Sequence, residues 1–431
     1  MTADNSDEIA IQHQEASQYR WVIGAALLPL HVAIGLNLFA PVPLFPLIRD
    51  DYVLSRGIVS LIMVLAFLAF TIFLIPGGLI AAKLGTKKAI IISGYLMAAG
   101  VFVTITSNFA ALLPLRVAFG IGGGILLPAT ATVIVQWFRP NERPILNALF
   151  LAGQGTGVAT AMFLSVPLAD ALEWRMVFTI YGLFAFVGAT AWLLLGRTPP
   201  PGAAPIGTSP MMAVLGSLKN RNTLLLSLAL VGPFAMFIGY SSWLPTYYNE
   251  EFDMPLQRGN SLLAIPPLMG VLVNILSGFL LARLGLRRPL MLASGLLFPL
   301  SAFGAFYFDN TAVIIAAILL MGISFWLFLP TVLTTAMELP GVSSDKVGMI
   351  TAAALTFGNL STIVAPLLVG ITTDMLGSYV PSMSTLAILP VTAVIAAWLL
   401  PETGPRAKRR ITFSSGLSPE VDPISVPMDR S

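Results

Sequence analysis

The chain has 431 residues, of which 56% are hydrophobic and 10% charged, and its mean hydropathy is +0.86. Soluble globular domains carry about 25% charged residues, so this composition excludes a protein coated by water on all sides and predicts one embedded in lipid. The formal net charge of +3 comes without a basic stripe of interleaved aromatics, which argues against a nucleic-acid partner. Cysteine is absent, which excludes a disulfide framework and thiolate chemistry.

Apolar stretches follow one another along most of the chain. After a polar N-terminal segment that lacks the basic region of a signal peptide, twelve stretches of roughly 20 residues or more are long enough to cross about 30 Å of hydrocarbon. We place them at residues 22–47, 57–82, 88–107, 109–136, 145–170, 175–196, 223–248, 259–283, 288–308, 311–337, 347–373 and 379–400.

A single long interruption divides these stretches into two groups of six. The segment "GRTPPPGAAPIGTSP", residues 196–210, has the Pro/Gly/Ser composition of a linker. We therefore predict five parts: an N-terminal tail (1–20), a six-helix bundle (21–196), a linker (197–222), a second six-helix bundle (223–400) and a C-terminal tail (401–431).

Basic residues predict the orientation in the membrane. With both termini placed in the cytoplasm, eighteen of the 23 lysines and arginines lie on the cytoplasmic side and four on the outer side, while Arg116 lies within a span. Cytoplasmic loops of membrane proteins carry such an excess of positive charge. We therefore expect a multi-pass protein of the cytoplasmic (inner) cell membrane with both termini inside.

The two groups of stretches resemble each other in sequence. "GGLIAAKLGTKK" at 77–88 and "SGFLLARLGLRR" at 277–288 both consist of an apolar run followed by a glycine with basic residues on either side. Three further segments pair at offsets of 202 to 205 residues: 126–132 with 328–334, 55–61 with 257–263, and 152–157 with 357–362. Each segment resembles the segment six spans later, and an even number of spans returns the chain to the same side of the membrane. The two halves are therefore predicted to be parallel repeats. Two similar bundles can rock about a site between them, which favours transport by alternating access.

These motifs resemble those of the major facilitator superfamily over about residues 20–400. The family's cytoplasmic loop motif, G-x-L-A-D-R-x-G-R-[RK], is matched by Gly78, Lys83, Gly85 and Lys87 in the first copy and by Gly278, Arg283, Gly285, Arg287 and Arg288 in the second. Its fourth-span motif, R-x-x-x-G, is matched by Arg116 and Gly120. The resemblance implies an all-α membrane transporter of twelve helices.

The acidic residue of the loop motif is missing, because Ala82 and Ala282 stand in its place. In the family this carboxylate resembles a latch that pairs with basic residues when the cytoplasmic side is shut. We hypothesise that other acids replace it, with Glu142, Glu338 or Asp345 meeting Lys83, Arg139, Arg143 or Arg283. The alternative is that these are ordinary solvated charges of the cytoplasmic face.

Polar side chains at membrane depth are costly and are therefore candidates for a binding site. Repeat alignment places Gln154 opposite Asn359, whereas His31 and Arg116 have no polar counterpart in the other half. The candidates for substrate binding are His31, Arg116, Gln154, Tyr240, Trp326 and Asn359. For each of them helix packing, interhelical hydrogen bonding or an interfacial position is the alternative role. The glycine run at 120–124 is better explained by close helix packing than by nucleotide binding.

Two potentially positive groups, His31 and Arg116, with no carboxylate in the middle of any span, favour a small organic or inorganic anion as substrate. The fifth span, "AGQGTGVATA", is loosely similar to nitrate/nitrite porters and the general layout to cyanate-type porters, but the arginines that nitrate porters use in spans two and eight are missing. A neutral, aromatic or quaternary-ammonium solute, taken up or exported, is the alternative, because aromatic faces can hold a cation.

The ionisable residues and motifs also bear on how transport is coupled to an energy source and on the class of protein. Only His31 can titrate near neutral pH within the bundle, so the sequence predicts either uniport or exchange, or proton symport that depends on His31. With no nucleotide loop, metal cluster or paired nucleophile and base, we expect no enzyme activity and no cofactor. The expected partners are a small-molecule substrate, a coupling proton or counter-solute, and the lipid bilayer around a monomer. A non-transporting receptor or scaffold is the alternative from another class.

Overall fold

The computed structural model describes residues 4–139, 142–198, 216, 219–339, 344–404 and 406. Most of the predicted linker and nearly all of the predicted C-terminal tail therefore lie outside the described residues. The elements are α1 (Asp4–Phe39), α2 (Pro41–Tyr52), α3 (Arg56–Leu84), α4 (Thr86–Met97), the 3₁₀ helix η1 (Ala98–Ile105), α5 (Phe109–Trp137), α6 (Arg143–Leu172), α7 (Trp174–Leu195), α9 (Arg221–Phe252), α10 (Leu256–Leu263), α11 (Ile265–Leu284), α12 (Arg288–Tyr307), α13 (Thr311–Glu338), α14 (Ser344–Leu376), α15 (Val380–Ile388) and α16 (Val391–Leu399).

The all-helical prediction is confirmed over the described part of the chain. Within the described residues, eleven helices are long and apolar enough to cross a membrane. The segments Leu256–Gly270 and Leu272–Leu281, which cover α10 and most of α11 and are bent by 41° to each other, bring the number to as many as twelve. Several predicted spans are broken into two consecutive helices. The first continues through α2 as one unit, Gln18–Tyr52, and the last consists of α15 and α16.

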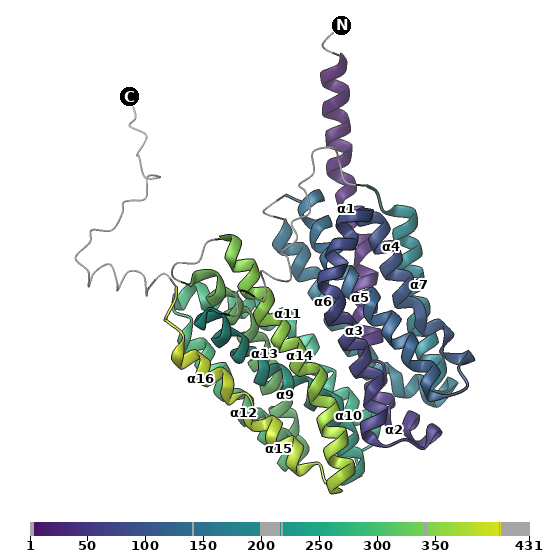
Figure 1. Cartoon of the computed structure of the whole chain (residues 1–431), viewed down its shortest axis with the longest axis vertical. Helices are drawn as coiled ribbons and strands as arrows, with labels where there is room; N and C mark the ends of the chain where they lie inside the picture. The colour runs from purple at the N-terminus through teal and green to yellow at the C-terminus, as the bar shows by residue number, and fades with distance from the viewer. Residues whose placement is uncertain are drawn as a thin grey trace, which may run out of the picture.

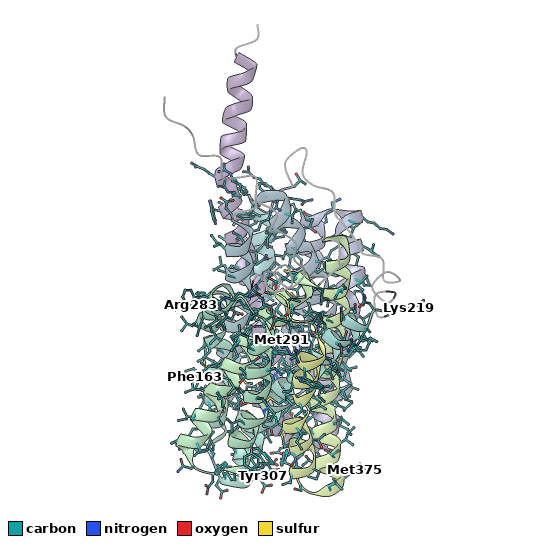
Figure 2. The ribbon with its side chains drawn as sticks, turned by 90° about the vertical axis from the view of Figure 1, so that its left-hand side faces the viewer. Phe163, Lys219, Arg283, Met291, Tyr307 and Met375 are labelled. Atoms are coloured by element: carbon teal, nitrogen blue, oxygen red, sulfur yellow. The ribbon has the colours of Figure 1, made fainter. Side chains whose placement is uncertain are left out.

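The helices form two lobes that lie side by side (Figure 1). We call α1–α7 the N-lobe and α9–α16 the C-lobe. The lobes approach each other where α2 and α10 lie and diverge at the opposite end, from which α1 projects. Figure 2 places Lys219 and Arg283 toward this diverging end and Tyr307 and Met375 at the other. We refer to the two ends as the linker end and the α2/α10 end.

The duplicated corner is built from glycine in both lobes. Helix α3 ends before Gly85 (φ 81°) and α11 ends before Gly285 (φ 62°). Positive φ values cost little for glycine and are strained for other residues, which explains why the corner keeps this residue in both copies. A second repeated signal lies at the other end of the lobes. Asn108 and Asn310 cap the N-termini of α5 and α13 with their side-chain oxygens.

The glycine run of α5 permits close helix packing, as the sequence predicts. A Cβ atom on Gly120 would lie 2.3 Å from the carbonyl oxygen of Ala66 on α3, and one on Gly122 would lie 2.6 Å from that of Ser93 on α4. These distances are far below normal contact, so the backbones of three helices meet here. The tight packing makes this part of the N-lobe a rigid support for the interface with the C-lobe.

Candidate functional site

A cavity of about 210 Å³ lies between the lobes, near the middle of the long helices. The N-lobe contributes residues of α1, α3 and α6, and the C-lobe contributes residues of α9, α10, α11, α13 and α14. Its walls are mostly apolar. A cavity enclosed by two pseudo-equivalent lobes is the arrangement that the repeat predicts for a transported solute.

The polar groups of the cavity are all uncharged: Gln154, Ser241, Trp326, Asn359 and Thr362. The Trp326 indole donates to the carbonyl oxygen of Pro266 (2.8 Å), and the Thr362 hydroxyl donates to that of Asn359 (2.7 Å). Within the described ranges the side-chain amides of Gln154 and Asn359 form no hydrogen bond to protein. These two amides, one from each lobe, are therefore available to a ligand.

Aromatic rings form much of the C-lobe wall. The rings of Phe237 and Phe325 stack with centroids 4.1 Å apart, and Phe325 meets Trp326 edge-on at 5.3 Å. A Cβ atom on Gly270 would lie 2.8 Å from the Trp326 ring, so the glycine lets the indole lie directly against α11. Stacking and this close contact fix the orientation of the rings and give the cavity a stiff apolar floor.

His31 lies one helical turn from the cavity and outside its lining. The ring stacks on Phe150 of α6 (4.4 Å between centroids), its Nδ1 lies 3.1 Å from the carbonyl oxygen of Leu27, and the residue is 3% exposed. His31 precedes the lining residue Gly35 by four positions, and Phe150 precedes Gln154 by four. His31 thus belongs to the contact between α1 and α6, on the linker side of the cavity.

Arg116 is buried inside the N-lobe. Its Nε donates to the carbonyl oxygen of Ile62 on α3 (3.2 Å), and its guanidinium lies over the rings of Phe119 and Phe178 at 5.0 and 5.7 Å. Among the described residues no acid pairs with it. This geometry joins α3, α5 and α7, and does not bring Arg116 to the cavity.

Tyr240 also points away from the cavity, although it lies on the same helix as lining residue Ser241. Its hydroxyl donates to the carbonyl oxygen of Met383 on α15 (3.1 Å), and the residue is fully buried. Of the six predicted binding residues, the structure therefore brings Gln154, Trp326 and Asn359 together in one cavity, and the other three contact neighbouring helices.

The loop-motif residues of the second copy form a network within the C-lobe. Arg287 makes a two-pronged ion pair with Glu338 (2.7 and 2.8 Å). The Glu402 carboxylate accepts hydrogen bonds from the backbone amides of Arg287 and Arg288, at the start of α12. In the first copy no ion pair of Lys83 or Lys87 occurs within the described residues.

Glu142 pairs with Arg20 of its own lobe at 2.8 Å. Hydrogen bonds from the backbone amide of Arg139 and from the Arg20 guanidinium hold the pKa of Glu142 below its usual value. Arg143 donates to the carbonyl oxygens of Phe138 and Val135, and the side chain of Asp345 lies outside the described residues. In this conformation the described acids of the predicted gate are thus paired within single lobes.

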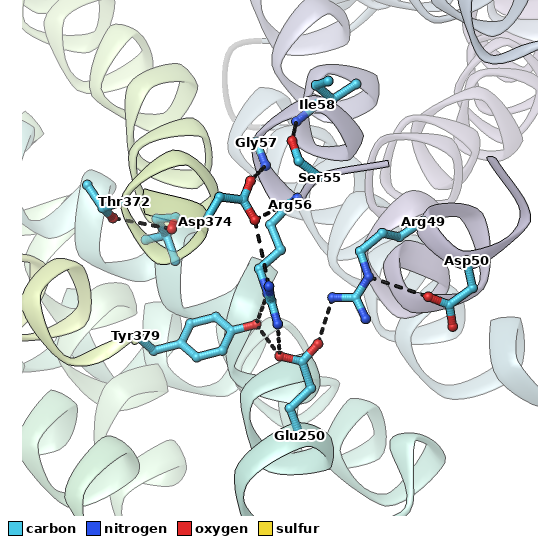
Figure 3. Close-up of polar contacts among 11 residues, drawn as sticks. Arg49, Asp50, Ser55, Arg56, Gly57, Ile58, Glu250, Thr372, Asp374 and Tyr379 are labelled. Carbon is cyan, nitrogen blue, oxygen red and sulfur yellow. Dashed lines mark hydrogen bonds and ion pairs between the residues drawn. The ribbon is translucent and has the colours of Figure 1, made fainter. Parts of the chain in front are cut away.

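A polar cluster joins the two lobes at the α2/α10 end (Figure 3). Arg49 of α2 and Arg56 of α3 each lie 2.7 Å from one oxygen of Glu250 on α9. The Tyr379 hydroxyl donates to Glu250 (2.8 Å) and accepts from Arg56 Nε (3.1 Å). We call Arg49, Arg56, Glu250, Asp374 and Tyr379 the interlobe cluster.

Asp374 extends the cluster to the backbone of the N-lobe. Its carboxylate, at the end of α14, accepts hydrogen bonds from the backbone amides of Arg56 (3.1 Å) and Gly57 (2.8 Å), at the start of α3. A Cβ atom on Gly370 would lie 2.8 Å from the carbonyl oxygen of Arg56, so the two helix ends touch. An acid of one lobe thus caps a helix of the other. The sequence analysis did not predict this cluster. A signal was available, because Arg49 and Arg56 are two of the four basic residues predicted on the outer side, and Glu250 and Asp374 lie at helix ends on the same side.

Comparison with known proteins decides the family. A family model described as Major Facilitator Superfamily matches residues 27–345. The chain belongs to this superfamily. It is a multi-pass membrane transporter of a small-molecule substrate and not an enzyme, as its sequence motifs predict.

Relatives and solved structures agree with this assignment. The chain is 25% identical to the Probable galactarate/D-glucarate transporter GarP of Escherichia coli (strain K12), over 72% of this chain and 78% of the relative. It is 22% identical to the Hexuronate transporter of Bacillus subtilis (strain 168), over 78% and 83%. In fold it is similar to a bacterial homolog of the human lysosomal transporter Spinster, with a TM-score of 0.72 and 17% identity over 93% of this chain and 99% of that one.

Proposed function

We propose that the protein carries a small polyhydroxylated organic anion of the sugar-acid class by alternating access. The relatives that align over most of the chain are named for galactarate/D-glucarate and for hexuronates. The observation that carries the proposal is the cavity between the lobes, where Gln154 and Asn359 present unpaired amides from opposite sides. Side-chain amides can donate to carboxylate oxygens and both donate to and accept from hydroxyl groups.

The uncharged lining sets the mode of recognition. Since no charged side chain of the described residues lines the cavity, a carboxylate there is bound by neutral donors and not by an ion pair. Hydroxyl groups of a sugar acid match the remaining polar members, Ser241 and Thr362, while its carbon chain lies on the apolar wall. A site that fits a hydroxyl-bearing ligand rejects analogues that leave its buried polar groups unpaired.

The contacts between the lobes support a conformation in which the cavity opens toward the linker end. The interlobe cluster holds the lobes together at the α2/α10 end, whereas the described ion pairs near the linker end, Arg20 with Glu142 and Arg287 with Glu338, stay within one lobe. We place the linker end in the cytoplasm, because most basic residues lie there, and the protein, as a monomer, in the inner cell membrane. The structure would then represent the inward-facing half of the cycle.

Uptake of an anion needs a driving force. Moving one negative charge inward against a potential of 100 mV costs about 2.3 kcal/mol. Proton symport or exchange for an internal anion would offset this cost, and His31, one turn from the cavity, is the candidate proton carrier.

Flux into proteoliposomes tests the proposal. Purified protein should accumulate labelled D-glucarate or a hexuronate faster than liposomes without protein, and an excess of unlabelled acid should compete. Uncharged D-glucose is the matched control and should neither enter faster nor compete. Absence of flux for every organic acid tested would contradict the proposal.

The aromatic wall favours a second candidate, a quaternary-ammonium or neutral solute. The stacked pair Phe237 and Phe325 and the adjacent Trp326 present ring faces and edges beside the two amides, and rings can hold a cation without a carboxylate. Choline included in the same assay separates the candidates. Binding of any of these solutes without flux would indicate a receptor.

A further inference from the structure

In the interlobe cluster, carboxylates of the C-lobe accept hydrogen bonds and ion pairs from a set of donors on the N-lobe. The donors of the N-lobe are the guanidiniums of Arg49 and Arg56 and the backbone amides of Arg56 and Gly57. The acceptors are the carboxylates of Glu250 and Asp374, both from the C-lobe. The two guanidiniums take different oxygens of the same Glu250 carboxylate, each at 2.7 Å. The N-lobe thus already binds a carboxylate here, and that carboxylate belongs to the protein.

Separation of the lobes at this end would remove the C-lobe carboxylates from the N-lobe donors. The guanidinium group stays charged at any physiological pH, so Arg56 would face the opening as an unpaired positive charge. Arg49 would keep only its 3.5 Å contact with the exposed carboxylate of Asp50, on its own helix. Both arginines are also placed on the way to the cavity. Arg56 precedes the cavity-lining Phe67 by eleven positions on α3, about 16 Å at the helical rise.

The cavity itself gives an independent reason to look for cations elsewhere. Its described lining contains no charged group, and Arg116 and His31 are turned into the N-lobe. A carboxylate that reached the cavity directly from water would lose hydration without gaining an opposite charge, which is costly. A cationic site at the entrance would offset part of this disadvantage, because it raises the local concentration of the anion next to the cavity.

We propose that Arg49 and Arg56 form an entrance site for the substrate carboxylate at the α2/α10 end, which Glu250 and Asp374 occupy whenever that end is closed. This inference rests on the proposed function, because it takes the substrate to be an organic anion. Substrate and C-lobe carboxylates then compete for the same donors. An anion at this end therefore stabilises the open state, and its passage into the cavity allows the cluster to re-form.

Transport kinetics measured from one side of the membrane distinguish an entrance site from a cluster that only holds the lobes together. Glu250→Gln and Asp374→Asn weaken the closed state but keep the donors, so they should lower the half-saturating D-glucarate concentration measured from the α2/α10 side. Arg49→Gln and Arg56→Gln weaken the closed state and also remove donors, so they should raise it about tenfold, the usual effect of losing a charge-assisted hydrogen bond. Arg56→Lys, which keeps the charge, should give an intermediate value. If all four neutral variants lower it alike, the cluster only holds the lobes together and the entrance site is refuted.

A labelling experiment separates this inference from the proposed function. The chain has no native cysteine, so Ser55→Cys, beside Arg56, can be labelled alone, with Ser107→Cys as a control outside the cluster. In the Glu250→Gln/Asp374→Asn background, D-glucarate should slow labelling at residue 55 at least threefold and leave residue 107 unchanged, and adding Arg56→Gln should abolish the protection. Protection without flux would uphold the entrance site and contradict the proposed function, whereas flux without protection would do the reverse.

Discussion

At the scale of single residues, the amide pair Gln154 and Asn359 connects the sequence to the site most directly. The two residues occupy equivalent places in the repeat, and each is polar at membrane depth among glycines and small residues. The structure places both side chains in the lining of the same cavity, without a protein partner among the described residues. An unpaired amide in a mostly apolar wall is costly unless a ligand or water satisfies it.

Removal of either amide should weaken substrate binding. For Gln154→Ala and for Asn359→Ala we expect the half-saturating D-glucarate concentration to rise about tenfold, since each variant deletes one hydrogen bond to a charged or hydroxyl group. Thr160→Ala is a matched control, because Thr160 lies on the same helix as Gln154 but outside the cavity, and its hydroxyl donates to Thr156. Unchanged uptake by both alanine variants would contradict the assigned site.

His31 gives a prediction about coupling. If uptake is driven by protons, His31→Ala should abolish acceleration by an inward pH gradient and leave exchange of external for internal substrate intact, because exchange needs no proton. Uptake measured with and without the gradient provides the readout. Proton-driven uptake that persists unchanged in the variant would exclude His31 as the proton carrier.

Polar residues at membrane depth could be recognised from the sequence, but the direction in which their side chains point could not. Gln154 and Asn359 face the cavity, whereas Arg116, His31 and Tyr240 face neighbouring helices of their own lobe. Helices that are apolar all round carry no clear polar face, so the pattern does not reveal which side meets the other lobe. The sequence repeat indicated the cavity-facing residues only at Gln154 and Asn359, where both halves have a polar residue.

At the scale of helices, the contact between α1 and α6 supports the N-lobe side of the cavity. A Cβ atom on Gly35 would lie 2.1 Å from the carbonyl oxygen of Gln154, and one on Gly157 would lie 2.1 Å from that of Val32. The obstructing atoms are backbone in both cases, so a larger residue must push the helices apart. The same contact holds Gln154 in position.

Gly35→Ala should therefore destabilise the protein by about 1–3 kcal/mol, the usual cost of overpacking, and displace Gln154. Thermal unfolding in detergent measures the effect, and uptake should fall together with stability. Gly278→Ala is the control, since no atom lies within 4 Å of the added methyl group, and alanine is the better helix former. Equal melting temperatures for the two variants would show that the close contact is unimportant.

The ends of helices were harder to predict than their existence. The twelve apolar stretches and the two glycine corners are evident in the sequence, because length, composition and positive-φ glycine are local properties. The cap that Asp374 provides for α3 depends on contact between residues more than 300 positions apart. No local pattern encodes such a contact.

At the scale of the whole molecule, the two ends are closed to different degrees. Glu250 and Asp374 bind the other lobe, whereas Glu142 and Glu338 bind arginines of their own lobe. The linker end must therefore exchange partners when it closes. The loop motif lacks its usual acid in both copies, so these acids are the candidates for that exchange.

Neutralising the candidate acids together, as Glu142→Gln, Glu338→Gln and Asp345→Asn, should favour the state open at the linker end. A cysteine at Leu151, in the cavity lining, should then react faster with an impermeant maleimide applied from that side. Glu173→Gln, in the connection between α6 and α7 at the other end, is the control. Equal labelling rates would indicate that these charges are only solvated surface groups.

The central claim is that the two lobes tilt against each other about the cavity, and distances between spin labels test it most directly. One pair, Leu84→Cys with Leu284→Cys, reports on the linker end, and the other, Ser107→Cys with Asp309→Cys, on the α2/α10 end; all four positions are exposed. Weakening the interlobe cluster with Glu250→Gln and Asp374→Asn should lengthen the second distance and shorten the first. If both distances change in the same direction, or neither changes in a protein that still transports, the tilting account is contradicted.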